Sequence, residues 1–334
     1  MTFDQARACL LAAQRIGIVR TDHLGDMVLT LPLARVLKEE FPAAEIVMIA
    51  HSRTAPLLEG LKVIDRCEYV DRTPLPMIFR RMKFDVLFFP RSRPEEAWHA
   101  WRAKVPVRVG TVYRWWSGLY SVRIAEHRRH GLFHEAEYNV RMVEHIMRKR
   151  YFVRLEPPPV SEIARNYISH VLKASGIQPA EPFIVLHPGG RGSSPLWTKF
   201  PSLAKMLRQQ LPNTHLVVTG ITEDAMRAEE IVRAVPQVIN LCGMLTLEQL
   251  IALLEKAAVV VANSTGIIHI AAALGRPVVG LYPASPPALS PARWAPLTQR
   301  RAVLAATPID RISPIHVAEE VRKLLCGNYY PRSV

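Results

Sequence analysis

The order of apolar residues along the chain constrains the fold more than any other feature. Short apolar runs rich in β-branched residues alternate with longer stretches whose apolar residues recur at helical spacing. The predicted strands of the first half are residues 15–19, 45–49, 84–89 and 107–112. The predicted helices of the first half are residues 27–41, 95–104 and 134–150. Strands that alternate with helices predict a parallel sheet covered on both faces.

This alternation is interrupted once, by the segment EPPP at residues 156–159, which favours a stiff extended chain and cannot continue a helix. The predicted strands beyond it are residues 183–186, 215–219, 238–241, 259–261 and 278–281. The predicted helices beyond it are residues 201–211, 223–235, 247–257, 265–274 and 314–325. The chain has 334 residues, more than the roughly 250–300 at which a single core stops growing. We therefore expect two Rossmann-like α/β domains, residues 1–156 and 157–334, and leave open whether the last helix packs back on the first domain.

Two domains of this kind that face each other leave a cleft at the carboxyl ends of their strands, where open α/β sheets bind ligands. The sequence has neither the G-x-G-x-x-G fingerprint nor the G-x-x-x-x-G-K-[ST] loop. A nicotinamide or flavin enzyme and a P-loop kinase are therefore disfavoured. The sequence also lacks Asp-x-Asp and any acidic–His cluster at metal-ligand spacing, so it predicts no metal site.

The charge of the chain is strongly positive and unevenly distributed. The formal net charge is +14, and residues 72–150 alone hold 17 basic and 7 acidic side chains together with four of the six tryptophans. A basic stretch with interleaved aromatic residues has four interpretations: nucleic-acid binding, contact with an anionic membrane surface, binding of an acidic substrate, or a plain solvated surface.

The expected location is the cytoplasm. The longest apolar runs, such as residues 257–262, fall far short of the roughly 20 residues of a membrane span, and the start of the chain is a poor signal peptide. The four cysteines are scattered without a C-x-x-C pair, which suits a reducing compartment and no structural zinc.

The turn RTDHLGD at residues 20–26 follows the first predicted strand and opens a helix. Gly25 lets the backbone come close to a ligand, and Asp26 is suited to accept a proton from an attacking hydroxyl. Spacing alone leaves a second interpretation open, in which Asp26 only caps the free N–H groups of the helix.

Two further turns are candidate anion sites. The segment NSTGIIH at residues 263–269 follows a predicted strand and begins a helix, whose free N–H groups and dipole suit a diphosphate, with Ser264 and Thr265 adding hydroxyl donors. His269 lies one turn into that helix, either as a packed side chain or as a ligand contact. The segment HPGGRGSS at residues 187–194 offers backbone N–H groups and Arg191, or is simply a loop.

Four segments in register resemble glycosyltransferase family 9, the ADP-heptose:lipopolysaccharide heptosyltransferases. They are IGIVRTDHLGDMVLTLP at residues 16–32, HEAEYNVRM at 134–142, HPGGRGS at 187–193 and VVANSTGIIHIAAALGRPVVGLY at 260–282. The resemblance implies a GT-B fold, with the acceptor bound by the first domain and the nucleotide-sugar by the second. It also implies an inverting, metal-independent transfer, with no cofactor besides the nucleotide-sugar, which is a substrate.

The same resemblance implies residue roles. Asp26 matches the proposed general base of the family, Thr265 and Gly266 match the positions that receive the donor diphosphate, and Glu223 matches an acidic position associated with the donor nucleoside. The residues expected on the donor side are Thr265, Gly266, Ser264, Glu223, Gly189, Gly190, Arg191, Lys199 and His269. The residues expected on the acceptor side are Arg20, His23, Gly25, Arg53 and His134.

The departures from the family pattern all fall on the donor side. Ser264 stands where an acidic residue is common, and Tyr282-Pro283-Ala284 stands where an aromatic-Gly-Pro sequence is common. The usual lysine before the residue matching Trp197 is missing, and Arg191 or Lys199 is left to supply its charge.

The predicted function is transfer of heptose from ADP-heptose to a lipopolysaccharide core, an acidic glycolipid at the inner membrane face. We expect peripheral contact with that anionic face and no nucleic-acid partner. The alternatives are a GT-B transferase with another nucleotide-sugar donor, or a non-catalytic homologue that binds a sugar nucleotide or a polyanion.

Overall fold

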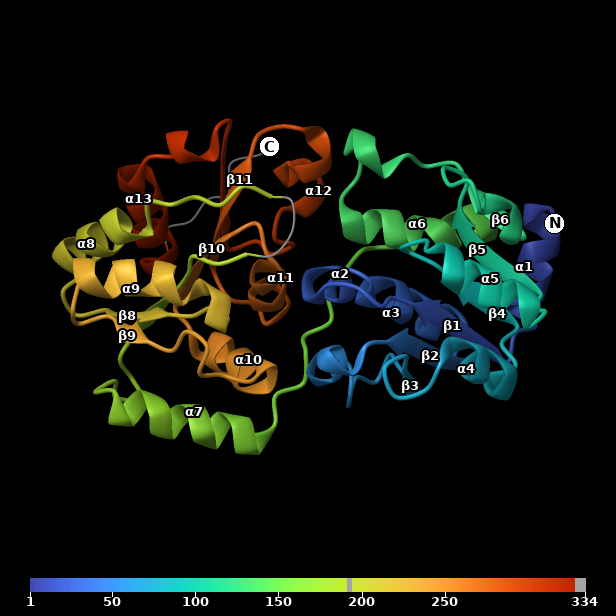
Figure 1. Ribbon diagram of the computed structural model, residues 1–334, viewed down its shortest axis with the longest axis horizontal. Coiled ribbons are helices and arrows are strands. Elements are labelled where there is room, and N and C mark those ends of the chain that lie inside the picture. Colours follow the sequence, from blue (N-terminus) through green and yellow to red (C-terminus); the bar gives the residue numbers. More distant parts are fainter. Residues whose placement is uncertain (191–193, 328–334) are drawn as a thin grey trace. The chain divides into compact units, whose positions relative to one another are not determined.

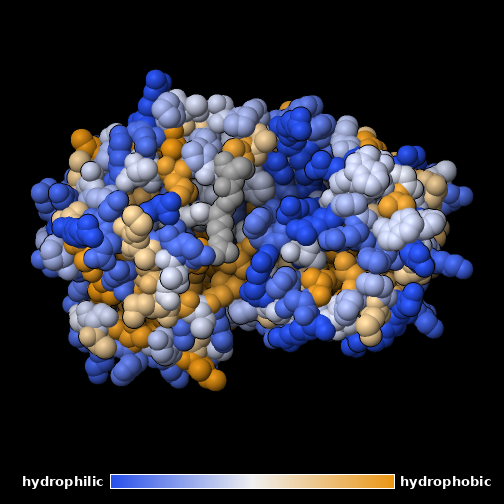
Figure 2. Space-filling view, viewed as in Figure 1, coloured by the Kyte–Doolittle hydropathy of each residue, from blue (hydrophilic) through white to orange (hydrophobic). Residues whose placement is uncertain are grey.

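The computed structural model describes residues 1–190 and 194–327. The chain divides into two compact units, Met1–Pro159 and Val160–Val334, and the division falls at the end of the proline segment. In each unit the strands form a central sheet with helices on both sides (Figure 1). Hydrophilic side chains cover most of the surface in the view of Figure 2, while the apolar side chains form the cores.

The first unit contains a six-stranded parallel sheet in the order β3-β2-β1-β4-β5-β6. Its strands are β1 (Arg15–Val19), β2 (Glu45–Ala50), β3 (Arg66–Tyr69), β4 (Val86–Phe88), β5 (Val107–Thr111) and β6 (Val122–Ile124). The four central strands confirm the predicted ones, and the two at the edges, β3 and β6, were not predicted. Their side chains are partly exposed, so neither forms the continuous apolar run of a buried strand.

Helices cover both faces of this sheet. Its longer helices are α1 (Phe3–Leu11), α2 (Leu24–Val28), α3 (Leu31–Glu40), α4 (Leu75–Met82), α5 (Pro94–Arg102) and α6 (Glu135–Met147). On one face, α4 and α5 pack against each other and over a core that includes Phe79, Phe89 and Tyr120. On the other, α6 packs against α1 and α3.

The predicted helix over residues 27–41 is wrong in its continuity, because the structure has α2 and α3 there. Pro32 lies in the first turn of α3. Its ring would clash with the carbonyl of Val28 in an unbroken helix, and it has no N–H to donate. The break leaves α2 as a short helix directly after β1, and this helix carries Asp26.

The second unit repeats the architecture, with the parallel order β12-β11-β10-β7-β8-β9. Its strands are β7 (Phe183–His187), β8 (His215–Val218), β9 (Ile239–Asn240), β10 (Val259–Asn263), β11 (Val278–Pro283) and β12 (Arg301–Ala306). Five of these were predicted, and β12, again an edge strand with partly exposed side chains, was not.

The helices of the second unit are α7 (Glu162–Ala174), α8 (Phe200–Gln210), α9 (Ala225–Ala234), α10 (Leu247–Lys256), α11 (Gly266–Ala273), α12 (Pro291–Trp294) and α13 (Pro314–Leu325). The bounds of α13 are those predicted. Its apolar face contacts α8 and joins the core of the second unit through Val317, Val321 and Leu324. Whether α13 also packs on the first domain stays a prediction.

The described residues contain neither a membrane-spanning helix nor a metal-binding cluster. None of their helices is both long and apolar enough to cross a bilayer. Within the same residues, no group of three or more His, Cys, Asp or Glu side chains is arranged to hold a metal ion.

Candidate active site

The turn after β1 contains a buried arginine surrounded by carboxylates. The side chain of Arg20 is 2% exposed, and its Nε lies 2.7 Å from Asp22 Oδ1. Its Nη2 donates to Asp26 Oδ1, and its Nη1 lies 3.8 Å from Glu135 Oε1. Strands of a parallel sheet end at one edge, so this turn lies at the carboxyl edge of the first sheet.

Asp26 is held by Arg20 and does not cap its helix. The N-cap of α2 is His23, which makes no side-chain capping bond, and Asp26 lies in the first turn. Its side chain keeps 18% of its surface exposed, although one oxygen is bound to Arg20. Burial raises the pKa of Asp26 above its ordinary value, Arg20 opposes that rise, and the nearby Asp22 and Glu135 add to it. The partly accessible carboxylate is therefore a better proton acceptor than a fully exposed aspartate.

Two of the carboxylates around Arg20, those of Asp22 and Glu135, each have a second arginine as a partner. Arg91 donates to Asp22 Oδ2 over 2.8 Å, and Arg128 donates to Glu135. Although burial acts to raise it, Arg20 and Arg91 hold the pKa of Asp22 below its ordinary value. The site is thus a network of alternating charges, with Asp26 as its most accessible carboxylate.

The other residues predicted on the acceptor side lie around this network in different roles. His23 is exposed and Gly25 is buried. Arg53 is exposed and donates from Nη2 to the backbone oxygen of Asp22 over 2.6 Å. His134 is buried at the start of α6, where its Nδ1 accepts from the backbone N–H of Ala136. Arg20 is buried among carboxylates and donates to Asp26, and its predicted contact with an acceptor stays a prediction.

Glu96 joins the site although the sequence analysis did not single it out. It lies in the first turn of α5, is 2% exposed, and its Oε1 accepts from Thr21 Oγ1 over 2.7 Å. Thr21 belongs to the turn that carries Asp26. Glutamate is common in the first turn of a helix, because the helix dipole favours a negative charge there. The local sequence therefore gives no sign that the side chain of Glu96 is buried.

Glu96 makes stability depend on pH. Burial raises its pKa from 4.5 to about 7, so the folded chain binds this proton more tightly than the unfolded chain does. Stability should therefore fall as pH rises between these values and stay reduced above pH 7. We expect Glu96→Gln to be more stable than wild type at pH 8, by up to about 3 kcal/mol, with no difference below pH 4.5. Urea unfolding across pH measures this, and the exposed neighbour Glu95→Gln is the matched control; equal curves for Glu96→Gln and wild type would contradict it.

The carboxyl edge of the second sheet holds the predicted diphosphate segment. Thr265 is the N-cap of α11, and its Oγ1 is buried without a hydrogen-bond partner among the described residues. The first N–H groups of a helix have no partner within the helix, and those of Gly266 and Ile267 belong to this class. Together with the partly exposed Ser264, these groups can donate to an anion.

The two described glycines after β7 are explained by close packing at this edge. A Cβ on Gly189 would lie 2.1 Å from Asp224 Oδ2, and one on Gly190 would lie 2.9 Å from Thr265 Cγ2. The loop after β7 therefore lies directly against the start of α11 and against the turn after β8. Arg191, the cation predicted in this loop, lies outside the described residues.

Asn263, at the end of β10, joins the loops of this edge. Its Oδ1 accepts from the backbone N–H of Trp197 and its Nδ2 donates to the backbone oxygen of Pro188, each over 2.8 Å. The residue is 1% exposed. Asn263 thereby fixes both neighbouring loops to the strand that leads to Thr265.

Removing the side-chain amide of Asn263 should destabilise the loops at the carboxyl edge of the second sheet. We expect Asn263→Ala to lower the free energy of unfolding by about 1–3 kcal/mol, because two buried backbone groups lose their partners. The KM for the nucleotide-sugar that the sequence predicts should rise more than the KM for the predicted acceptor. Chemical denaturation and steady-state kinetics measure the two effects. Asn240→Ala, which removes a single bond to the N–H of Cys242, is the control and should change both quantities less.

The structure places the remaining donor-side residues in the turn after β8, at the start of α8 and within α11. Glu223 is exposed in the short turn Thr222–Asp224 after β8, and the buried carboxylate there is Asp224, which accepts from the N–H of Ile221. Lys199 is half-buried at the N-cap of α8. His269 is buried in α11 with its ring centroid 6.4 Å from that of Trp294.

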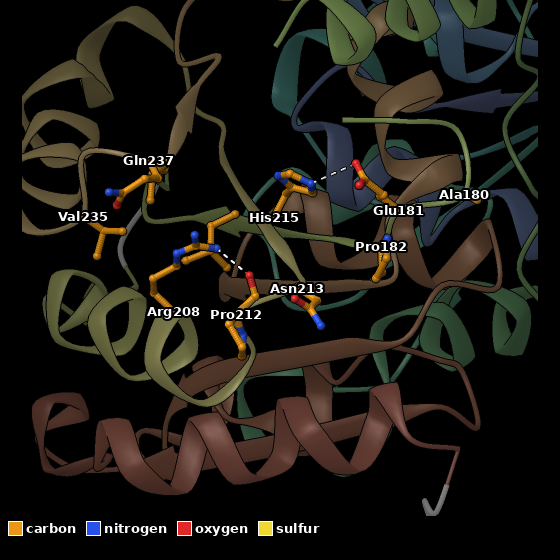
Figure 3. Close-up of a pocket in the computed structure, with 11 residues that line it drawn as sticks. Ala180, Glu181, Pro182, Arg208, Pro212, Asn213, His215, Val235 and Gln237 are labelled. Carbon is orange, nitrogen blue, oxygen red and sulfur yellow. Dashed lines mark hydrogen bonds and ion pairs between the residues drawn. The ribbon is translucent and has the colours of Figure 1, made fainter. Parts of the chain in front are cut away.

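A cavity of about 600 Å³ lies at the opposite end of the second sheet (Figure 3). Its lining includes Glu181 and Pro182, which precede β7, and His215, the first residue of β8. His215 Nε2 lies 3.1 Å from Glu181 Oε2. None of the predicted site residues lines this cavity, because they follow the strands rather than precede them.

Known protein sequences resemble this chain over most of its length. The sequence model of glycosyltransferase family 9 (heptosyltransferase) matches residues 95–311. Lipopolysaccharide heptosyltransferase 2 of Escherichia coli is 25% identical over 316 residues, covering 87% of each chain.

Solved structures match the fold over nearly the whole chain. A family 9 glycosyltransferase of Veillonella parvula matches with a TM-score of 0.82 at 19% identity, covering 94% of this chain and 97% of that one. The ADP-heptose lipopolysaccharide heptosyltransferase II of E. coli matches with a TM-score of 0.78 at 23% identity, covering 94% and 99%. The two parallel six-stranded sheets with their helices are thus of the GT-B type, as predicted. Because the family model spans well over half of the chain, the protein belongs to glycosyltransferase family 9 (heptosyltransferase) and is a glycosyltransferase.

Proposed function

We propose that this glycosyltransferase transfers heptose from ADP-heptose to a lipopolysaccharide core acceptor, with inversion and without a metal ion. The observation that carries the proposal is Asp26, a partly exposed carboxylate with a raised pKa, held by buried Arg20 at the carboxyl edge of the first sheet. The names of the relatives, lipopolysaccharide heptosyltransferases of E. coli and Salmonella typhimurium, support the choice of sugar and acceptor.

The proposed step is a single displacement. The acceptor hydroxyl gives its proton to the free oxygen of Asp26 while its oxygen forms a bond to the anomeric carbon of the donor sugar. The bond from that carbon to the diphosphate breaks, and the diphosphate takes the electron pair. Attack opposite the leaving group inverts the anomeric centre.

On the donor side, the leaving diphosphate needs neutralisation. The proposal assigns this to the N–H groups at the start of α11, the unpartnered hydroxyl of Thr265 and a cation from Arg191 or Lys199. Glu223 is proposed to bind the ribose hydroxyls of the nucleoside. The loop of Gly189 and Gly190 contributes backbone donors beside Thr265.

The proposed acceptor is an acidic glycolipid, which places the protein in the cytoplasm, peripheral to the inner membrane. The basic excess of residues 72–150, in the unit that carries Asp26, supports an anionic partner. No nucleic acid is part of this proposal.

A second candidate is a transferase with another nucleotide-sugar donor, and a third is a homologue that binds a sugar nucleotide or polyanion without catalysis. The departures at Ser264, at Pro195 and Leu196 before Trp197, and at Pro283 motivate both, since all of them lie on the donor side.

One experiment separates these candidates. The purified protein is incubated with ADP-, GDP- and UDP-sugars and a truncated core oligosaccharide, and the products are identified by mass. The proposal expects a product with ADP-heptose. Product only with another donor overturns the choice of donor, and neither transfer nor donor hydrolysis with any sugar favours the non-catalytic homologue.

A further inference from the structure

Four large apolar side chains lie exposed on one helical layer of the first unit, and the proposed chemistry uses none of them. Their exposed fractions are 61% for Met77 on α4, 44% for Trp98 and 46% for Trp101 on α5, and 87% for Trp115 in the loop after β5. Tryptophan side chains are mostly buried in folded proteins, as Trp197 is here. Several exposed indoles in one layer therefore indicate a contact surface.

These side chains belong to an ordered surface. Trp98 and Trp101 are one turn apart on α5, and their ring centroids lie 5.1 Å apart. Trp115 stands edge-on against Trp116, with centroids 5.3 Å apart, and Trp116 Nε1 donates to Ser92 Oγ just before α5. Trp116 also packs against the same core as the inner sides of α4 and α5.

Exposed cations lie on or next to the elements that carry these side chains. Five exposed basic residues of the same layer make no ion pair among the described residues: Arg80, Lys83, Arg102, Lys104 and Arg114. The exposed acidic residue of α5, Glu95, lies 3.8 Å from Arg93. We call the four apolar residues and these five cations the tryptophan face. Figure 2 shows strongly hydrophilic side chains intermixed with pale, weakly polar ones over the surface of the first unit.

Indole rings beside basic side chains suit the interface of an anionic bilayer. The ring enters the headgroup region while its N–H stays hydrated, and Lys or Arg binds lipid phosphates. Single-stranded nucleic acid would instead need open ring faces for its bases, whereas Trp98 and Trp101 contact each other. The lipid surface is therefore the partner that the geometry favours.

The tryptophan face is joined directly to the proposed catalytic turn. Glu96, two residues before Trp98, binds Thr21, and Thr21 lies in the turn that carries Asp26. A sugar chain anchored in a bilayer beneath α5 would thus begin close to the carboxyl edge of the first sheet. We propose that the tryptophan face docks the protein on an anionic phospholipid bilayer. The choice of this particular partner rests on the proposed function, since a lipid-linked acceptor requires such a membrane.

Co-sedimentation with lipid vesicles tests the proposal. The full chain should bind vesicles of phosphatidylethanolamine and phosphatidylglycerol, and bind phosphatidylcholine vesicles far more weakly. Replacing Trp98, Trp101 and Trp115 together by Ala should lower binding to the anionic vesicles at least about tenfold. Replacing Arg102 and Lys104 by Gln should lower it about thirtyfold at low salt, and less at high salt.

The controls remove similar groups elsewhere. Phe152→Ala with Met226→Ala removes two exposed apolar side chains, and Lys173→Gln with Lys205→Gln removes two exposed charges. Both controls should bind vesicles as wild type does, and circular dichroism should show native spectra for all variants. Vesicle binding that is equal in wild type and the triple variant, or lost equally in the controls, would overturn the proposal. Single-stranded DNA that displaces the protein from vesicles, and whose binding needs the same tryptophans, would favour the nucleic-acid interpretation instead.

A second readout separates this proposal from the proposed function. Transfer to a water-soluble core oligosaccharide should be unchanged in the triple tryptophan variant, whereas transfer to acceptor embedded in vesicles should fall. If no donor gives product but vesicle binding depends on the tryptophans, the docking surface stands and the proposed reaction fails. If transfer to both acceptors is equal in wild type and variant, the docking surface fails and the reaction stands.

Discussion

Asp26→Asn is expected to lower the rate of sugar transfer at least ~100-fold, the usual scale for loss of a general base. The amide oxygen can still accept from Arg20, so the contact seen in the structure is retained while the proton acceptor is lost. The measurement is kcat with the donor and acceptor that give product. Near-normal turnover would remove the role assigned to Asp26.

The matched control for this variant is Asp71→Asn, at the same edge of the sheet. Asp71 follows β3 and binds the N–H of Ser52 over 2.8 Å, away from Arg20. Its replacement should leave kcat within about threefold of wild type, because among the described residues the exposed Asp71 side chain contacts only the neighbouring Ser52 and His51.

The pH dependence of transfer gives an independent check of the same role. Asp26 must be deprotonated to act as a base, and burial raises its pKa above the ordinary value of 3.8. Transfer should therefore decline as pH falls through this raised pKa, while wild type is still folded. Residual activity of Asp26→Asn should lack that decline.

Arg20→Met is expected to lower the free energy of unfolding by about 3–5 kcal/mol, more than Asn263→Ala does. The change leaves Asp22, Asp26 and Glu135 close together without the cation that they share. Urea denaturation at pH 7 to 8 measures the loss. Arg80→Met, at an exposed arginine without an ion pair among the described residues, is the control and should cost less than about 0.5 kcal/mol.

The pH dependence of this loss has a definite sign. Without Arg20, the pKa of Asp26 rises further and the pKa of Asp22 loses the guanidinium that lowers it, so both carboxylates bind protons more tightly than they do in folded wild type. The Arg20→Met loss should then shrink as pH is lowered through those raised values. A loss below 1 kcal/mol, or one that is independent of pH, would show that the carboxylates do not depend on Arg20.

Among the described residues, every central strand was predicted from the sequence, but of the edge strands only β9 was. β1, β7 and β10 are covered on both faces, so each is a continuous apolar run that can be recognised without any knowledge of its neighbours. The strands that were missed, β3, β6 and β12, all lie at sheet edges and carry exposed side chains such as Arg66 and Arg123. Their strand conformation depends on a neighbour that the local pattern does not contain.

The sequence by itself determined the alternation of strands and helices, the turns that follow the strands, and hence Asp26 and Thr265 as candidate residues. These features depend on interactions within a few residues, such as helical periodicity, proline geometry and the free N–H groups of a helix start. Only the tertiary structure decided what surrounds them. Arg20 meets Glu135 from α6, Thr21 meets Glu96 from α5, and Asn263 meets Trp197 and Pro188. Burial and ion pairing between distant segments set the pKa of a carboxylate, and both arise only when the chain closes around it.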